Sequence, residues 1–236
     1  MNNQFLEKQS FRNALLALLF LVPAPSIGLL AVLVWFPDSF GRTMFGLSKV
    51  WLFVFPAVWT IGVDREYWRL PARPRLGIGV GMLSGIVIFL SIIGGYALLG
   101  RHWVNGEHIQ SVASSVGLNL PIVYLSAAAY WCILNSLLEE YVWRWFVYRK
   151  CEIVLPGWGA VLLSAVFFTI HHVIALHAYF DLRITVVGAL GVLVGGITWS
   201  GCYLKFRSVW PGWISHVWAD VAVFGVGYHL FFMLNS

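Results

Sequence analysis

Long apolar stretches, separated by short polar connections, follow one another along most of the 236-residue chain. Windows of about 19 residues identify segments that can cross about 30 Å of hydrocarbon. Seven such spans are predicted, near residues 14–36, 46–63, 77–99, 119–138, 157–178, 184–201 and 209–232. A break of the last span at Gly225 and Gly227 would give eight crossings. The pattern therefore predicts an all-α fold, a polytopic membrane helical bundle with seven to eight transmembrane helices.

The polar connections are too short to contain a second domain. The longest cover residues 64–76 and 100–118, which cannot bury a core of their own. We therefore predict a single membrane domain over residues 1–236. Glycines recur at every fourth position in two of the spans, which favours close approach of helix backbones; they are Gly77, Gly81 and Gly85 in the third span and Gly191 and Gly195 in the sixth.

Composition and charge agree with a membrane protein and indicate its orientation. Hydrophobic residues make up 60% of the chain and charged residues 11%, and the formal net charge is +5. The basic residues lie in short connections beside spans, so they report membrane topology and not a nucleic-acid partner. With seven spans, the N-terminal side holds Lys8, Arg12, Arg65, Arg69, Arg73, Arg75, Arg144, Arg149, Lys150, Lys205 and Arg207. The opposite side holds Arg42, Lys49, Arg101 and Arg183. The positive-inside rule then predicts a cytoplasmic N-terminus.

This topology gives further expectations about location and partners. We expect a multi-pass protein of the bacterial cytoplasmic membrane, because the chain is short and shows no organelle-targeting extension. Membrane lipids are then its surroundings, and the oligomeric state stays open. The same topology places the polar stretch at residues 139–144 at the cytoplasmic end of the fourth span.

That stretch, "LLEEYVWRWF" from Leu137 to Phe146, contains three charges within an apolar helix pattern. Ionisable groups at a helix centre cost about 2.5–3.5 kcal/mol on insertion scales. Residues four apart share a helix face, so Glu140 and Arg144 are the natural ion pair. Glu139 is rotated by about 100° from Glu140 and shares a face with Asn135. Glu139 is thus a candidate general base, although both glutamates can also be solvated at the membrane interface.

Two later spans contain further ionisable groups. His171 and His172 are adjacent in "SAVFFTIHHV", so only one of them can point to a given partner. His216 and Asp220 lie four apart in "WPGWISHVWADV", so the carboxylate can orient the imidazole or both can face one cavity. Each group taken alone is also explained by helix packing. Together, a glutamate, histidines and an imidazole–carboxylate pair are the groups needed to activate water and to stabilise an oxyanion.

The order of these residues resembles a known family. Glu139-Glu140-x-x-x-Arg144, Phe168-x-x-x-His172 and His216-x-x-x-Asp220 are similar to the three motifs of the CAAX-protease and bacteriocin-processing (CPBP, or Abi) family of intramembrane endopeptidases. The resemblance covers about residues 120–225. It implies peptide-bond hydrolysis at a membrane-embedded site that opens to the cytoplasm, and a peptide or membrane-protein substrate.

The resemblance also implies a role for each motif residue. Glu139 would be the base and His172 its partner, and Glu140 with Arg144 would support them. His216 and residue 220 would stabilise the oxyanion. The family's last motif often ends in asparagine, whereas this chain has Asp220, which must be protonated to donate a hydrogen bond or must act by orienting His216. His171 matches no family position, so either histidine can be the site histidine.

Three alternatives concern the cofactor and the activity. Water can be activated without a metal or by a zinc ion. Glu139, His172, His216 and Asp220 are acceptable zinc ligands. A b-type haem protein would use His171 or His172 together with His216 as axial ligands, but this gives the glutamates no role. A non-catalytic immunity or scaffold protein would keep the fold without the chemistry.

Overall fold

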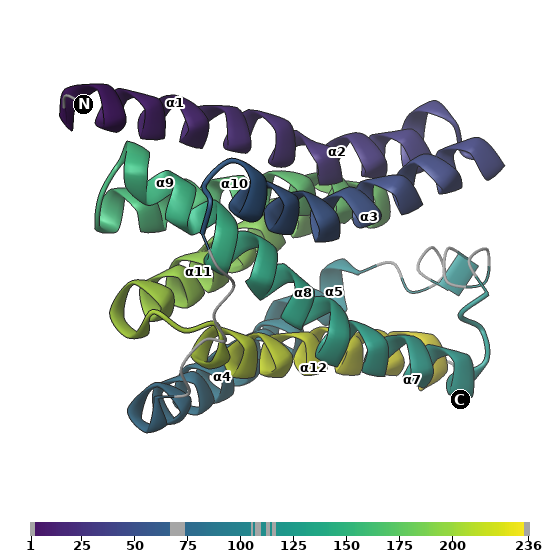
Figure 1. The fold of residues 1–236 in the computed structure, drawn as a ribbon. Helices are drawn as coiled ribbons and strands as arrows, with labels where there is room; N and C mark the ends of the chain where they lie inside the picture. The colour runs from purple at the N-terminus through teal and green to yellow at the C-terminus, as the bar shows by residue number, and fades with distance from the viewer. Residues whose placement is uncertain are drawn as a thin grey trace.

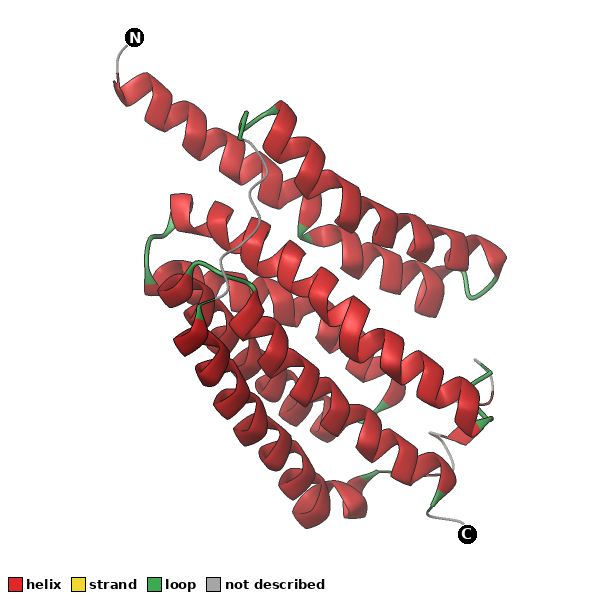
Figure 2. Ribbon diagram, turned by 60° about the horizontal axis from the view of Figure 1, so that its bottom comes forward, coloured by secondary structure: helices red, strands yellow, loops and turns green. Residues whose placement is uncertain are grey.

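A computed structural model of the chain describes residues 3–66, 74–104, 106, 110–111, 114 and 117–233. Nearly all of these residues are helical, and they include no β-strand. The predicted all-α fold is therefore confirmed. Figure 1 shows the helices packed as one bundle, and Figure 2 shows from a second direction that short loops connect most of them.

The N-terminal helices pack together along one side of the bundle (Figure 1). α1 (Asn3–Leu21) is followed directly by α2 (Pro23–Leu30) and a π-helical turn at Ala31–Trp35. α3 (Ser39–Gly62) returns along them. Its start is fixed by Asp38, whose Oδ1 accepts hydrogen bonds from the backbone N–H groups of Phe40 and Gly41 at 2.8 and 3.2 Å.

One long helix crosses the molecule obliquely (Figure 1). It consists of α7 (Pro121–Tyr130), a π-helical turn at Trp131–Asn135, α8 (Ser136–Glu140), a π-helical stretch at Tyr141–Tyr148 and α9 (Arg149–Val154). Its 34 residues extend about 51 Å at 1.5 Å per residue, more than the hydrocarbon thickness of about 30 Å. The predicted span 119–138 therefore ends too early, because the helix continues to Val154. Charged residues looked like a membrane boundary, but the helix continues past them.

The other helices complete the bundle. α4 (Arg75–Gly95) continues through a π-helical turn at Tyr96–Gly100 into α5 (Arg101–Trp103), while α10 (Trp158–Tyr179), α11 (Leu182–Phe206) and α12 (Trp210–Phe232) follow the long helix. α4 packs along α12, and α10 packs along α11. These contacts place α8, α10 and α12 around the residues singled out in the sequence.

Glycines permit two of these close contacts. Gly77, Gly81 and Gly85 are buried on α4, and a Cβ atom at Gly81 would meet the backbone of Pro211 on α12. The glycine stripe of the third span therefore packs helices together, as predicted.

The glycine stripe predicted in the sixth span does not form the helix contact. A Cβ atom at Gly191 would meet no atom within 4 Å, and the atoms nearest to one at Gly195 belong to Trp199 of the same helix. Gly196 instead packs against Ala165 and Phe168 of α10.

The number of membrane crossings is confirmed only in part. Within the described residues, six helices are long and apolar enough to span a membrane, and the chain is a multi-pass membrane protein. Neither seven nor eight crossings is confirmed. α12 is a continuous helix through Gly225 and Gly227, so the predicted break does not occur. Its polar residues, among them His216 and Asp220, lower its mean hydropathy.

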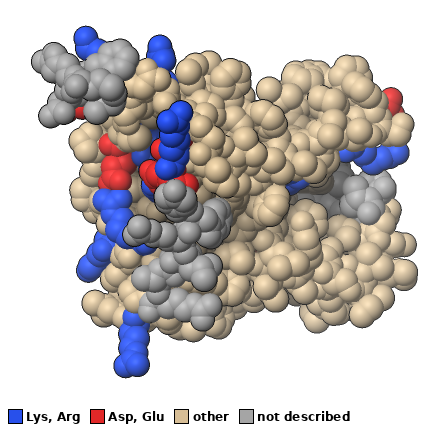
Figure 3. Space-filling model, in the orientation of Figure 1, with Lys and Arg blue, Asp and Glu red and all other residues tan. Residues whose placement is uncertain are grey.

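Charged side chains gather towards opposite ends of the face seen in Figure 3, with an uncharged band between them. At the end that holds α9, the chain forms three ion pairs: Arg149–Glu66, Lys150–Asp64 and Arg207–Glu152. The basic residues predicted beside the spans include Arg69 and Arg73, which lie outside the described residues.

Candidate active site

Glu140 lies at the centre of the buried side of the site, here called the sealed side. Its carboxylate is completely buried, and Oε1 is 3.2 Å from Arg144 Nη1, the pair predicted from helical spacing. The same oxygen is 3.1 Å from Nδ1 of His216, which reaches it from α12. Gly212 makes this approach possible, because a Cβ atom at that position would clash with Glu140 Oε2. One buried carboxylate thus links the long helix to α12.

Arg144 is enclosed by aromatic rings. Its guanidinium carbon lies 4.4 Å from the ring centroid of Phe168 and 4.9 Å from that of Trp199. Trp199 also stacks on His216, with 3.9 Å between ring centroids. The planar, weakly hydrated guanidinium suits such stacking. Arg144 is only 1% exposed, so counting it among the cytoplasmic loop residues was wrong.

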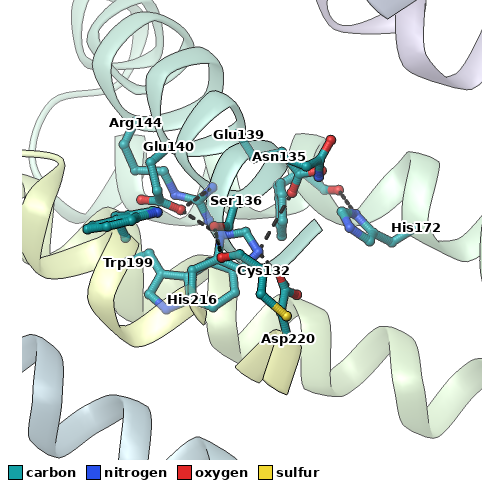
Figure 4. A network of polar contacts seen from close by, with 12 residues as sticks. Cys132, Asn135, Ser136, Glu139, Glu140, Arg144, His172, Trp199, His216 and Asp220 are labelled. Atoms are coloured by element: carbon teal, nitrogen blue, oxygen red, sulfur yellow. Dashed lines mark hydrogen bonds and ion pairs between the residues drawn. The ribbon is translucent and has the colours of Figure 1, made fainter. Parts of the chain in front are cut away.

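Glu139 faces the less sealed side of the same helix (Figure 4). Its side chain is 15% exposed, against 0% for Glu140. Oε1 accepts a hydrogen bond of 2.9 Å from Asn135 Nδ2, the residue predicted to share its face. Oε2 lies 3.7 Å from Nε2 of His216. Among the residues that the structure describes, Glu139 has no arginine partner, and it keeps one oxygen directed towards the histidines.

His172 comes close to Glu139 from α10. Its Nδ1 lies 2.8 Å from the carbonyl oxygen of Phe168. A carbonyl only accepts, so Nδ1 carries the proton and the Nε2 lone pair of neutral His172 is free. The depth of His172 within its span matches that of Glu139, because both lie at similar distances along their helices from the loop at residues 155–157.

His171 also belongs to this cluster, which the family motifs did not predict. Its ring stacks on Trp143 at 5.2 Å between centroids and an interplanar angle of 8°. Glu139, His171 and His172 each offer one ligand atom, and these atoms lie within 4.8 Å of one another. The structure therefore places both adjacent histidines beside Glu139, and the expectation that only one of them can point to a given partner is wrong.

His216 and Asp220 face one another on α12 as their spacing predicted. His216 Nε2 lies 3.8 Å from Asp220 Oδ1, too far for a direct hydrogen bond. Asp220 is 21% exposed and lies on the less sealed side with Glu139. His216 is consequently surrounded by carboxylates, with Glu140 at Nδ1 and both Glu139 and Asp220 near Nε2. This crowding argues against the haem alternative, which needs one nitrogen open to iron.

Lys49 is a site residue that the sequence reasoning missed. It lies on α3, and its Nζ donates a hydrogen bond of 3.3 Å to Asn135 Oδ1. The topology count placed Lys49 in a loop, although the predicted span 46–63 already contained it. A lysine within a span was the signal that could have identified it.

π-helical turns flank the two glutamates on both sides, at Trp131–Asn135 and Tyr141–Tyr148. Such turns are rare in soluble proteins and are frequent at functional sites. Here they change the rotation of the long helix immediately before and after α8, which sets the directions of Glu139 and Glu140.

The predicted zinc ligands are only partly brought together. The cluster with mutual distances below 4.8 Å contains Glu139 and His172, but it includes His171 in place of His216 and Asp220. Two imidazoles and a carboxylate form an accepted catalytic zinc set that leaves one position for water. In donor type, the residues Glu139, His171 and His172 therefore fit a zinc ion.

The fold and this cluster define a multi-pass helical membrane protein with a hydrolase-like polar site inside the bundle. Residues 121–222 match the family of type II CAAX prenyl endopeptidases, Rce1-like. The matched segment includes all three motifs, and the resemblance to the CAAX-protease family is confirmed over this segment. The family consists of intramembrane proteases. No curated protein and no solved structure matches the chain.

Proposed function

We propose that the protein is an intramembrane endopeptidase in which Glu139 and His172 activate the attacking water. The contrast between the two glutamates carries the proposal. Glu140 is completely buried, and its Oε1 contacts Arg144 and His216, so substrate cannot reach it. Glu139 is 15% exposed, and its Oε2 faces the histidines. A base must reach the proton that it removes, and only Glu139 meets this condition.

The two acceptors beside the open side can orient one water molecule. One hydrogen of the water can bind Glu139 Oε2, and the other can bind the free Nε2 of His172. This arrangement leaves a lone pair on the water oxygen for attack on the peptide carbonyl. Glu139 takes one proton as the oxygen attacks the carbonyl carbon, and a tetrahedral oxyanion forms. The proton then passes to the amide nitrogen, the C–N bond breaks, and a carboxylic acid and an amine are released.

His216 and Asp220 would stabilise the oxyanion. An imidazolium at His216 donates from Nδ1 to Glu140 and from Nε2 towards the open side. A protonated Asp220 can donate a second hydrogen bond, whereas an ionised Asp220 instead orients His216. Donors directed at a developing oxyanion are typically worth about 10²–10³ in rate.

If the protein uses zinc, Glu139, His171 and His172 would hold it, and the ion would supply a water that ionises near neutral pH. His216 and Asp220 would keep their role at the oxyanion in that case. Elemental analysis of the purified protein tests this alternative, and equimolar zinc that is lost in His171→Ala would support it.

The decisive test compares the wild type with Glu139→Gln, His172→Ala and Glu140→Gln in proteoliposomes. One probe is a quenched fluorescent peptide with a prenylated C-a-a-X terminus, and a second is a leader peptide anchored in the same liposomes. We expect Glu139→Gln to lower cleavage by about 10³-fold, as loss of a general base does, without loss of thermal stability. Wild-type cleavage by Glu139→Gln would overturn the assignment. Absence of cleavage by the wild type on both probes would favour a non-catalytic membrane protein.

We also propose that the charged end formed by α9 faces the cytoplasm and that the site opens on that side, as the positive-inside rule and the family resemblance imply. Cys132, Cys151 and Cys202 are free and buried, so introduced cysteines can be labelled with little background. A membrane-impermeant maleimide should label Arg207→Cys only in inside-out vesicles and Asp38→Cys only in right-side-out vesicles. The reverse pattern would contradict the orientation.

A further inference from the structure

Lys49 links the N-terminal helices to the proposed base. It lies on α3, outside the segment 121–222 that matches the family. Its Nζ donates to Asn135 Oδ1 at 3.3 Å, and Asn135 Nδ2 donates to Glu139 Oε1 at 2.9 Å. Lys49 is also close enough for its charge to act on Glu139. A chain of two hydrogen bonds thus connects a cation on α3 to the open glutamate.

The directions of these two hydrogen bonds follow from which groups can donate and which can accept. A lysine ammonium can only donate, so it holds the carbonyl oxygen of the Asn135 amide towards itself. The NH₂ group of the amide must then point to Glu139. Without Lys49, the amide can turn over and present its oxygen to Glu139, which removes the donor that holds Oε1. Lys49 therefore fixes the amide orientation in which Asn135 donates to Glu139.

An ordinary ion pair does not explain this lysine. No carboxylate lies within ion-pair distance of Lys49 in the described part of the chain, and Nζ also lies 5.6 Å from the centroid of the Phe45 ring. A lysine inside a span is costly and by default indicates a functional site. Its hydrogen-bond partner is a buried amide, 6% exposed, that itself serves Glu139.

We propose that Lys49 is a positioning residue that acts through Asn135 to hold the Glu139 carboxylate in the orientation that a general base needs. The inference rests on the proposed function, since Glu139 is the base in that function. It assigns a part of the site to α3, so the matched segment 121–222 would be incomplete without the N-terminal helices. Lys49 itself touches neither the water nor the substrate in this proposal.

Several charged groups besides Lys49 face Glu139, and a test must keep them constant. They are His171 and His172 on α10, His216 and Asp220 on α12, and Glu140 and Arg144 on the long helix. The variants are therefore confined to positions 49 and 135, with Lys205→Met at the exposed end of α11 as the matched loss of one lysine.

Asn135→Leu breaks the two hydrogen bonds at their middle and leaves the lysine in place. It should therefore lower cleavage of the prenylated peptide as Lys49→Met does. Lys205→Met should cleave like the wild type. Wild-type cleavage by Lys49→Met would overturn the proposal.

Kinetics on the prenylated peptide separate positioning from substrate binding. We expect Lys49→Met to lower kcat by about 10- to 100-fold, the worth of a hydrogen bond to a charged group, with KM within about twofold. Lys49→Arg should recover most of the rate, and Lys49→Glu, which turns the amide over, should be slower than Lys49→Met. A raised KM with unchanged kcat would show that Lys49 binds substrate and would contradict the proposal. If Lys49→Met is fully active while Glu139→Gln is inactive, the positioning role fails and the proposed function stands.

Discussion

Glu139 and Glu140 are neighbours in the sequence, yet they lie in two different environments. Glu140 faces the sealed side, where Arg144 and His216 both contact its Oε1 and where its exposure is 0%. Glu139 faces the less sealed side, receives a hydrogen bond from the Asn135 amide and stays 15% exposed. A rotation of about 100° per residue is enough to separate them. The contacts of Glu140 on the sealed side hold the helices of the site together. The less sealed side leaves the Glu139 carboxylate available for chemistry.

The largest effect on stability is expected on the sealed side. Arg144→Leu leaves Glu140 buried without its cation, and breaking a buried pair in this way typically costs about 3–5 kcal/mol. Thermal or denaturant unfolding in detergent micelles measures the loss. The double variant Glu140→Gln with Arg144→Leu should recover much of it, because no unpaired charge remains. Glu139→Gln is the control on the open side and should change stability by less than about 1 kcal/mol.

Equal destabilisation by Arg144→Leu and Glu139→Gln would remove the distinction between the two sides. Both residues would then be structural, and the base would have to be sought elsewhere in the cluster.

The next effect concerns the contact between α12 and Glu140. Gly212→Ala places a methyl group against Glu140 Oε2. Overpacking of this kind costs about 1–3 kcal/mol, and it should also lower cleavage because His216 moves away from both glutamates. Gly225→Ala on the same helix is a matched control, since no atom lies within 4 Å of a Cβ there. Unfolding and cleavage assays on both variants check the prediction, and similar behaviour of the two would contradict the close contact.

A smaller effect is expected at Asp220, on the open side. If protonated Asp220 donates to the oxyanion, wild-type cleavage declines when the pH rises far enough to ionise it. Asn at this position donates at every pH. We therefore expect Asp220→Asn to cleave within about threefold of the wild type at its optimum, since an equivalent donor is kept, and to lose the alkaline decline. A pH–rate profile of both proteins is the measurement. Retention of the decline in Asp220→Asn would assign it to another group.

Helical periodicity was sufficient to predict the contacts within single elements. The pair Glu140–Arg144, the shared face of Asn135 with Glu139 and the shared face of His216 with Asp220 all follow from spacings of four residues. The predicted spans 77–99, 157–178 and 209–232 also begin and end within two residues of the helical segments. These features depend on local geometry, which the order of residues determines directly.

Contacts between elements could not be predicted in the same way. Lys49 reaches Asn135 from a helix 86 residues earlier in the chain, and Gly212 and Trp199 enclose Glu140 and Arg144 from two other helices. The end of the long helix was misplaced for a related reason. Charges usually mark the membrane boundary, but here Glu140 and Arg144 are paired and enclosed inside the bundle. The pair itself follows from spacing, but its burial depends on Trp199 and His216 from other helices.

The smallest effect is expected far from the site, at the exposed Arg207–Glu152 pair. This pair is bidentate, with N–O distances of 2.6 and 2.7 Å, but Arg207 is 54% exposed. The hydrogen bonds to the Glu152 carboxylate raise the pKa of the Arg207 guanidinium above its ordinary value, so Arg207 stays charged at every working pH. Solvent screening limits exposed pairs to about 0–1 kcal/mol. Arg207→Gln should therefore lower stability by less than about 1 kcal/mol and leave cleavage unchanged, whereas Arg144→Leu affects both. The same unfolding and cleavage assays make the comparison. A loss at Arg207 as large as that at Arg144 would mean that the charged end, and not burial around Glu140, holds the bundle together.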